Sequence, residues 1–217
     1  MQLICSLEEA VKRYDLVLVD SNIFCPTSFG ETIYEAKSPG DLSELESELR
    51  EAYFTLTSQL DAIAESDNVY TVPGVVSELR EFKGILSESL NWHQNKLGKS
   101  SVRKTRKEAS ANPHATYSSP EALHLLNNLC LGVEALITNI QVYTGPYASS
   151  KEDNSGTPTQ LFRAAIGFVE ENPEKSINIV SYGDEVNGML QEHITREVIR
   201  QVEKMYGPED MFKAAQP

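Results

Sequence analysis

Three acidic residues each follow a short apolar segment, and this placement is the clearest chemical signal in the sequence. The pairs are Leu16–Val19 before Asp20, Val69–Val72 before Glu78, and Ile177–Val180 before Asp184. Unbroken runs of Val, Leu and Ile are typical of strands covered on both faces, as in a parallel sheet. Because right-handed crossovers bring the carboxyl ends of parallel strands to one edge, we expect these three carboxylates to converge.

Carboxylates that converge at one sheet edge repel one another unless a cation compensates their charge. The natural compensator is a hard, oxygen-preferring ion, so Asp20, Glu78 and Asp184 predict a Mg²⁺ or Mn²⁺ site. Such ions suit phosphodiester hydrolysis. Ordinary structural explanations stay open, because the Asp-Ser-Asn sequence at 20–22 also suits a turn or cap, and the helix dipole favours a glutamate in a first turn. A helix that starts near Val75 would place Glu78 in its first turn.

The elements that must position these acids follow from capping signals and hydrophobic periodicity. Ser6 and Glu9 match a capping box that opens a short helix before the first strand. The apolar spacing over 41–66 predicts one long amphipathic helix, with its glutamates on a solvated face. Residues 21–40 show no clean period and predict a turn-rich segment.

The second half of the chain alternates in the same way. A strongly apolar helix is predicted from Pro120, and Thr157-Pro158 predicts the cap and first position of a helix that ends before Pro173. The tail predicts a terminal helix that ends at Gly207. Together these elements predict a single three-layer α/β/α domain over 1–217, with a central, mostly parallel sheet and a helical and loop insertion at 85–150.

One dense basic patch interrupts this acidic chain. It consists of Lys96, Lys99, Arg103, Lys104, Arg106 and Lys107. Trp92 and His93 precede it and Tyr117 follows, and basic residues interleaved with aromatics are what a phosphate backbone and an unstacked base require. The equally open alternative is a flexible, solvated loop over 87–119.

Composition restricts the class of protein further. The chain has 217 residues, with 19 Lys and Arg against 32 Asp and Glu, and a formal net charge of −13. Overall charge therefore opposes nucleic-acid binding, and any such contact must be local. Three scattered cysteines predict core thiols in a reducing compartment. Because neither a secretory signal nor a membrane-spanning run is recognisable, we expect a soluble cytoplasmic protein.

The order of the motifs resembles the PIN-domain family of metal-dependent ribonucleases. VLVDSN is followed by VPGVVSEL and then, after a helix, by INIVSYGDE. On this resemblance, Asp20, Glu78 and Asp184 correspond to acids of the family's site. It implies a Mg²⁺- or Mn²⁺-dependent endoribonuclease in which Asn22 and Ser181 orient ligands or the attacking water.

The sequence departs from the family's pattern at two points. The family usually has another Asp at the start of the helix before the final strand, where this chain has Thr159 and Gln160. Asp153, in the preceding loop, is a candidate fourth catalytic acid. Two residues separate Ser181 from Asp184, where the family more often has one. These departures support a second hypothesis, a catalytically inactive PIN-like module that binds RNA or a protein partner.

The resemblance also implies partners. RNA is the expected substrate, recruited by the basic patch over 96–107. An inhibitory protein partner is expected by analogy with the family's toxin members. A homodimer is a separate expectation that does not depend on the family. A third hypothesis, an unrelated doubly wound phosphatase-like or receiver-like domain, lacks its own motifs, because no phosphate loop, GxGxxG, DxD after the first strand or GxSxG elbow occurs.

Overall fold

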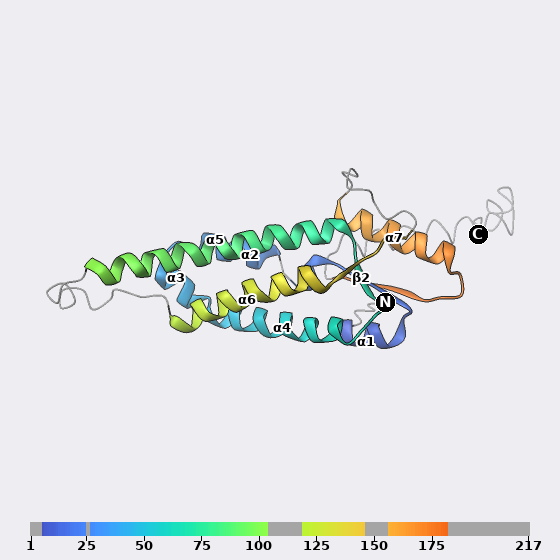
Figure 1. Cartoon of the computed structure of the whole chain (residues 1–217), viewed down its shortest axis with the longest axis horizontal. Helices are drawn as coiled ribbons and strands as arrows, with labels where there is room; N and C mark the ends of the chain where they lie inside the picture. The colour runs from blue at the N-terminus through green and yellow to red at the C-terminus, as the bar shows by residue number, and fades with distance from the viewer. Residues whose placement is uncertain (1–5, 25–26, 104–118, 146–155, 182–217) are drawn as a thin grey trace, which may run out of the picture.

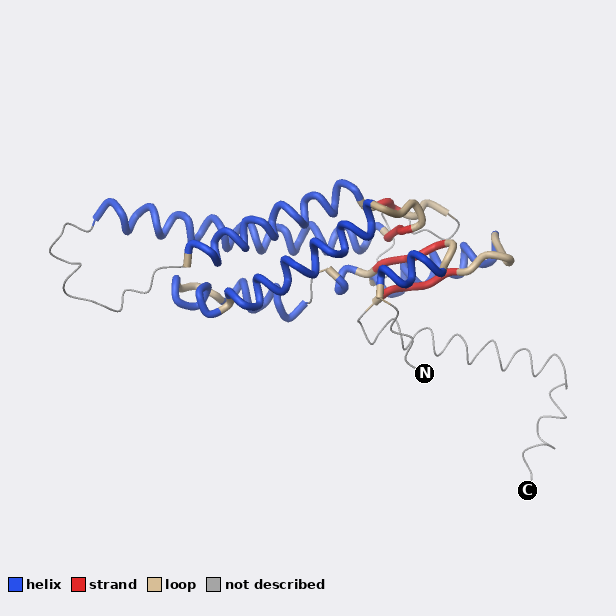
Figure 2. Tube along the Cα trace, turned by 90° about the horizontal axis from the view of Figure 1, so that it is seen from below, coloured by secondary structure: helices blue, strands red, loops and turns tan. Residues whose placement is uncertain are grey.

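A four-stranded parallel sheet forms the centre of the α/β fold. The computed structural model describes residues 6–24, 27–103, 119–145 and 156–181. Within these ranges, the strand order is β3-β2-β1-β4. The strands lie together beside one end of the long helices (Figure 2). The strands are β1 (Leu16–Val19), β2 (Val69–Thr71), β3 (Gln141–Val142) and β4 (Ile177–Val180). The predicted fold class is confirmed, since helices flank this sheet and the described strands all pair in parallel.

Helices account for most of the remaining described chain. They are α1 (Leu7–Arg13), the 3₁₀ turn η1 (Ser21–Ile23), α2 (Thr27–Glu35), α3 (Pro39–Glu44), α4 (Glu46–Ala64), α5 (Pro73–Arg103), α6 (Pro120–Asn139) and α7 (Thr157–Glu171). Helices α4, α5 and α6 pack together and project from the sheet as an elongated bundle (Figure 1). In the described ranges, no helix has both the length and the apolar character needed to cross a membrane.

The pairing of β1 with β4 brings two polar residues together. All four β1 residues are buried, and both faces of the strand are therefore covered, because alternate residues face opposite sides. Val19 lies opposite Val180, and the Asp20 N–H donates to the Val180 carbonyl at 3.1 Å. The residues that follow the two strands, Asp20 and Ser181, are consequently neighbours at the carboxyl edge of the sheet.

A second set of contacts, at the amino ends of the two strands, fixes the register between β1 and β4. The Ser176 N–H and hydroxyl both donate to Asp15 Oδ2, each at 2.8 Å. These hydrogen bonds, with the backbone one contributing most, hold the pKa of the Asp15 carboxyl below its usual value. A one-residue shift in the pairing of β4 with β1 would move every β4 side chain to the other face of the sheet. The hydrogen bonds between Ser176 and Asp15 oppose such a shift and so help to keep Ser181 in position.

Several elements differ from the sequence expectations. The segment predicted as one helix over 41–66 is divided at Leu45, and α3 begins with a capping box between Ser38 and Asp41. The expectation was wrong because apolar spacing continues across the junction. The segment predicted as turn-rich contains α2, and the two-residue strand β3 was not predicted.

The expected loop over 87–119 is also corrected in part. Helix α5 continues to Arg103, so that Lys96, Lys99 and Arg103 occupy helical positions. Lys104, Arg106 and Lys107 lie outside the described residues, and the assignment of 85–150 as an insertion stays a prediction. The described cysteine, Cys130, is buried in α6, as expected for a core thiol.

His93 is a core residue and not an exposed stacking platform. Its side chain is 1% exposed, and Nε2 lies 3.1 Å from the Ala36 carbonyl oxygen. Because a carbonyl only accepts hydrogen bonds, Nε2 carries the hydrogen. Burial is the main cause of a pKa below the usual 6.5; the Ala36 bond and Asp41 act in the opposite direction, and Lys37 lowers the pKa further.

This lowered pKa predicts that the protein loses stability as the pH falls below about 6.5. The unfolded chain protonates His93 at a higher pH than the folded chain does, so this histidine should reduce the free energy of unfolding as pH falls through 6.5. His93→Gln should weaken the pH dependence of unfolding, measured by urea titration at pH 7.5 and 5.5. His124→Gln, at an exposed histidine of α6, is the matched control. Equal pH dependence in the two variants would contradict the assignment.

Candidate functional site

A pocket of about 420 Å³ opens beside the carboxyl end of β1. Residues of the β1–η1 junction, α2, α5 and the start of α7 line it. They are Asp20, Ser21, Asn22, Gly30, Glu31, Glu78, Leu79, Glu81, Phe82, Ile85, Thr157 and Pro158. The pocket lies where open α/β sheets commonly bind their ligands.

Asp20 is buried at the pocket wall and is held from two sides. It is 5% exposed, and its Oδ1 accepts the Ser21 N–H at 2.7 Å. Its Oδ2 accepts the Ser181 hydroxyl at 2.6 Å, and the Ser181 oxygen in turn lies 3.1 Å from Asn22 Nδ2. The chain from Asn22 through Ser181 therefore fixes the orientation of the Asp20 carboxylate. A carboxylate has about four acceptor positions, so these contacts leave it capacity for a ligand.

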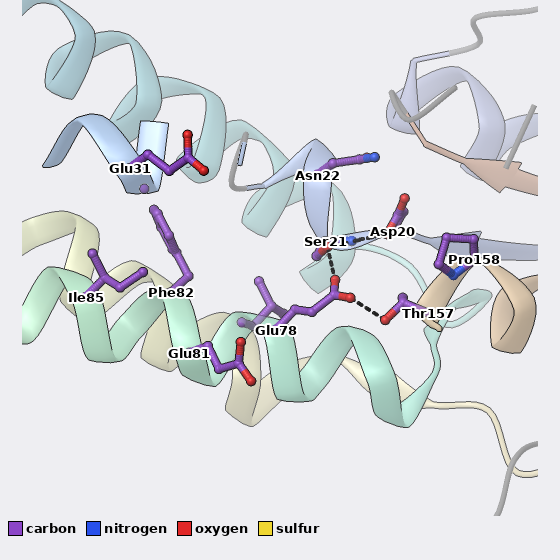
Figure 3. A pocket seen from close by; sticks show the side chains of 12 residues that line it. Asp20, Ser21, Asn22, Glu31, Glu78, Glu81, Phe82, Ile85, Thr157 and Pro158 are labelled. Atoms are coloured by element: carbon purple, nitrogen blue, oxygen red, sulfur yellow. Dashed lines mark hydrogen bonds between the residues drawn. The ribbon is translucent and has the colours of Figure 1, made fainter. Parts of the chain in front are cut away.

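Glu78 extends from α5 into the same pocket, close to Asp20. Its Oε2 accepts the Ser21 hydroxyl and its Oε1 accepts the Thr157 hydroxyl (Figure 3). Ser21 also lies beside Asp20, with 3.4 Å between Ser21 Oγ and Asp20 Oδ1. Since a hydroxyl has one hydrogen, Ser21 donates to Glu78 and bridges the two carboxylates. The structure thus brings together two of the three predicted metal-binding acids.

The start of α7 takes part in this arrangement in an unexpected way. Gly156, and not Thr157, is the N-cap, and α5 begins at Pro73, which places Glu78 beyond the first turn of its own helix. Thr157 instead directs its hydroxyl to Glu78. The start of the 15-residue helix α7 consequently lies beside this carboxylate.

Close packing of α5 on α7 keeps Glu78 and Thr157 in contact. The Gly74 N–H donates to Gln160 Oε1 at 2.9 Å. A Cβ atom added at Gly74 would lie 2.7 Å from Thr157 Oγ1 and 2.9 Å from Gln160 Oε1. Any larger residue at this position would therefore have to displace the Thr157 or Gln160 side chain. Gln160 occupies a buried position with a structural role near the start of α7.

The charged side chains that line the pocket are all acidic among the described residues. Asp20, Glu31, Glu78 and Glu81 line it, whereas none of its described lining residues is a lysine or an arginine. Neither Asp20 nor Glu78 forms an ion pair with another described residue. Of these four carboxylates Asp20 is the buried one, whereas Glu31, Glu78 and Glu81 are exposed. Burying a carboxylate without a cationic partner is costly, so the Asp20 side of the pocket is suited to receive a cation.

Comparison with known proteins does not decide the family. No protein-family model, no curated protein and no solved structure matches the chain. The fold and the pocket therefore supply the functional argument.

The remaining predicted residues fall outside this pocket. Asp184 and Asp153 lie outside the described residues, as do three members of the basic patch. Lys96 and Arg103 lie on α5, roughly 27 and 38 Å along the helix axis from Glu78 at 1.5 Å per residue. The described part of the expected RNA-recruiting stretch is therefore distant from Glu78.

The oxygen donors of the site fit a hard divalent cation. Within the described ranges, no group of three or more His, Cys, Asp and Glu side chains could hold a metal ion. A Mg²⁺ ion, however, is usually held by one or two carboxylates together with water and substrate phosphate oxygens. Asp20 and Glu78 supply two carboxylates, and the other polar side chains at the pocket are hydroxyls and an amide.

Sequence reasoning missed Ser21 and Thr157. Serine beside an aspartate and threonine before a proline are common in turns and caps, and both were interpreted in that way. The signal that could have identified Thr157 is Gly156, because a glycine is itself an acceptable N-cap and releases the threonine side chain for another contact.

Proposed function

We propose that this protein is a Mg²⁺- or Mn²⁺-dependent endoribonuclease. The observation that carries the proposal is the pair of carboxylates, Asp20 and Glu78, bridged by Ser21 in a pocket without a described basic side chain. An RNA phosphate could not approach these negative charges unaided. A bound divalent ion would neutralise them, activate a water and stabilise charge on the leaving oxygen.

Each residue of the site has a distinct role in this proposal. Asp20 and Glu78 hold the ion, and Asp184 and Asp153 are the candidates for completing its coordination. Ser21 and Thr157 fix the two oxygens of Glu78, while Ser181 and Asn22 fix Asp20. Such outer contacts orient ligands, and losing one commonly costs 10–100-fold in metal affinity or activity.

Two features support a PIN-like family assignment. The apolar segments before Asp20 and Glu78 are neighbouring parallel strands, and the third motif contains β4, which pairs with the other edge of β1. The order of motifs that resembles PIN domains therefore coincides with three neighbouring strands of the sheet, β2, β1 and β4.

A catalytically inactive PIN-like module is the second candidate. It is favoured by Gln160, whose side chain binds the Gly74 backbone near the expected acid position, and by the protein groups that already satisfy both oxygens of Glu78. Asp20→Asn separates the candidates. A nuclease should lose cleavage, whereas an inactive module should show no cleavage and should keep its binding partner.

The direct experiment is cleavage of a generic single-stranded RNA by the full-length protein. We expect cleavage with Mn²⁺ or Mg²⁺ that EDTA abolishes and that returns when excess ion is added. Absence of cleavage under all these conditions, on both unstructured and structured RNA, would contradict the enzymatic proposal and support the inactive module.

The basic positions on α5 predict a separate RNA-binding region. Changing Lys96, Lys99 and Arg103 to Gln should weaken binding and reduce the slope of log K against log salt by about 2, since each phosphate contact with a single strand contributes about 0.7. Fluorescence anisotropy with an uncleaved RNA, using the Asp20→Asn protein as background, measures this slope. Changing the exposed Lys12 and Lys175 to Gln is the control. An unchanged slope would exclude these positions from RNA binding.

A further inference from the structure

Thr71 places a buried hydroxyl at the end of β2, beside the strand that leads to Asp20. It is fully buried, and its Oγ1 donates a hydrogen bond to the Val19 carbonyl oxygen at 2.9 Å. The backbone pairing of β1 with β2 extends as far as Leu18 and Tyr70. The Thr71 hydroxyl therefore continues the link between the two strands beyond this pairing, up to the residue before Asp20.

The peptide bond between Val19 and Asp20 is held from both sides. Its carbonyl oxygen accepts the Thr71 hydroxyl from β2, and its N–H donates to the Val180 carbonyl of β4 at 3.1 Å. A peptide unit is planar, so these two bonds on opposite edges fix its orientation. The Cα atom of Asp20 belongs to the same planar unit, and the direction in which the Asp20 side chain leaves β1 depends on that orientation.

Thr71 also lies just before the helix that carries the second acid. Only Val72 separates it from Pro73, the first residue of α5, and Glu78 lies on that helix. The hydroxyl thus connects the end of β1, which bears Asp20, to the segment that leads to Glu78. Thr71 is not among the described lining residues of the pocket, so it acts on the site through the backbone.

We propose that Thr71 is a positioning residue of the metal site, and that its hydroxyl orients the Asp20 carboxylate toward the place where Glu78 meets it. The inference deepens the proposed nuclease function and depends on it for the ion. Valine at this position keeps the β-branched shape and the preference for a strand but removes the donor. The buried Val19 carbonyl then loses this partner, and the peptide unit before Asp20 is free to tilt.

Binding of Mn²⁺, measured by calorimetry, tests this role without requiring cleavage. Thr71→Val should weaken Mn²⁺ binding by about tenfold, as is common when a contact that orients a metal ligand is lost. Thr71→Ala should do the same, whereas Thr71→Ser keeps the hydroxyl and should retain the affinity. Thr57→Val is the matched control, because the Thr57 hydroxyl donates to the Tyr53 carbonyl within α4 at 2.8 Å, outside the described lining of the pocket.

Amide hydrogen exchange in EDTA gives a readout that a purely structural role would not produce. Thr71→Val should speed exchange at the Asp20 and Ser21 N–H groups more than at the Leu16 N–H. The Leu16 N–H donates to the Ser176 carbonyl at 3.2 Å, at the other end of β1. A general loss of stability would instead raise the three rates alike. Thermal unfolding in EDTA verifies that each variant folds.

The outcomes separate this inference from the nuclease proposal. Mn²⁺ affinity that is unchanged in Thr71→Val and Thr71→Ala, or an equal rise in the three exchange rates, would overturn the positioning role and leave the nuclease proposal intact. Failure of the unaltered protein to bind Mn²⁺ would contradict the nuclease proposal. The exchange rates would then decide the role of Thr71, since a selective rise at Asp20 and Ser21 supports it and any other pattern overturns it.

Discussion

Asp20→Asn should abolish Mn²⁺-dependent RNA cleavage while the protein remains folded. The substitution keeps the size of the side chain and removes the charge that would hold the ion. Metal catalysis contributes several kcal/mol to transition-state stabilisation, which corresponds to about a thousandfold or more in rate. Initial rates of cleavage at saturating Mn²⁺ measure this loss.

Metal-dependent stability distinguishes a lost ligand from a damaged fold. Mn²⁺ should raise the melting temperature of the unaltered protein and leave that of Asp20→Asn unchanged, since only a ligand of the native state stabilises it. In EDTA the two melting temperatures should agree within a few degrees, because Asp20 is buried without a cationic partner among the described residues. Asp61→Asn, on the exposed side of α4, is the matched control. Cleavage retained in Asp20→Asn would remove Asp20 from the mechanism.

Gly74→Ala should destabilise the protein by about 1–3 kcal/mol, the usual cost of overpacking. The added methyl group would lie within 3 Å of Thr157 Oγ1 and Gln160 Oε1, so these side chains must shift and lose their contacts or α7 must move away from α5. Threonine is β-branched and cannot swing aside easily. In a chain of this size the melting temperature should fall by roughly 2–10 °C. Cleavage should fall as well, because Thr157 would no longer hold Glu78.

Gly84→Ala provides the comparison for this prediction. Both glycines lie in α5, but the added Cβ at Gly84 has open space around it and should stabilise the helix by up to about 1 kcal/mol. Equal melting temperatures for the two variants would show that α5 and α7 tolerate separation at Gly74. That result would contradict the close approach described here.

The strands were largely predictable, whereas the helical boundaries were not. β1 and β4 coincide with the predicted segments because each is an unbroken apolar run bounded by polar residues. β3 has two exposed residues and forms through its pairing with β2. A pairing between distant segments leaves no local sequence pattern, so this strand could not be predicted. Helix α5 continues far beyond the point where its apolar pattern fades, and α6, packed alongside it, provides support that comes from tertiary contact.

The acids of the site were predictable to the extent that the strands were. Once Asp20 and Glu78 were placed after neighbouring parallel strands, their convergence followed from topology. The hydroxyl groups that connect them depend on the exact approach of η1 and α7, which are far apart in sequence. A short-range pattern therefore identified Ser21 and Thr157 only as turn and cap residues.

Binding of Mn²⁺ at the Asp20 and Glu78 carboxylates is the most direct test of the central claim. Crystals of the full-length protein soaked in MnCl₂ should show anomalous density between these two side chains. Crystals of Asp20→Asn treated in the same way should show none. Saturating Mn²⁺ that leaves this position without density, while the two carboxylates keep their contacts with Ser21, would contradict a metal-dependent site.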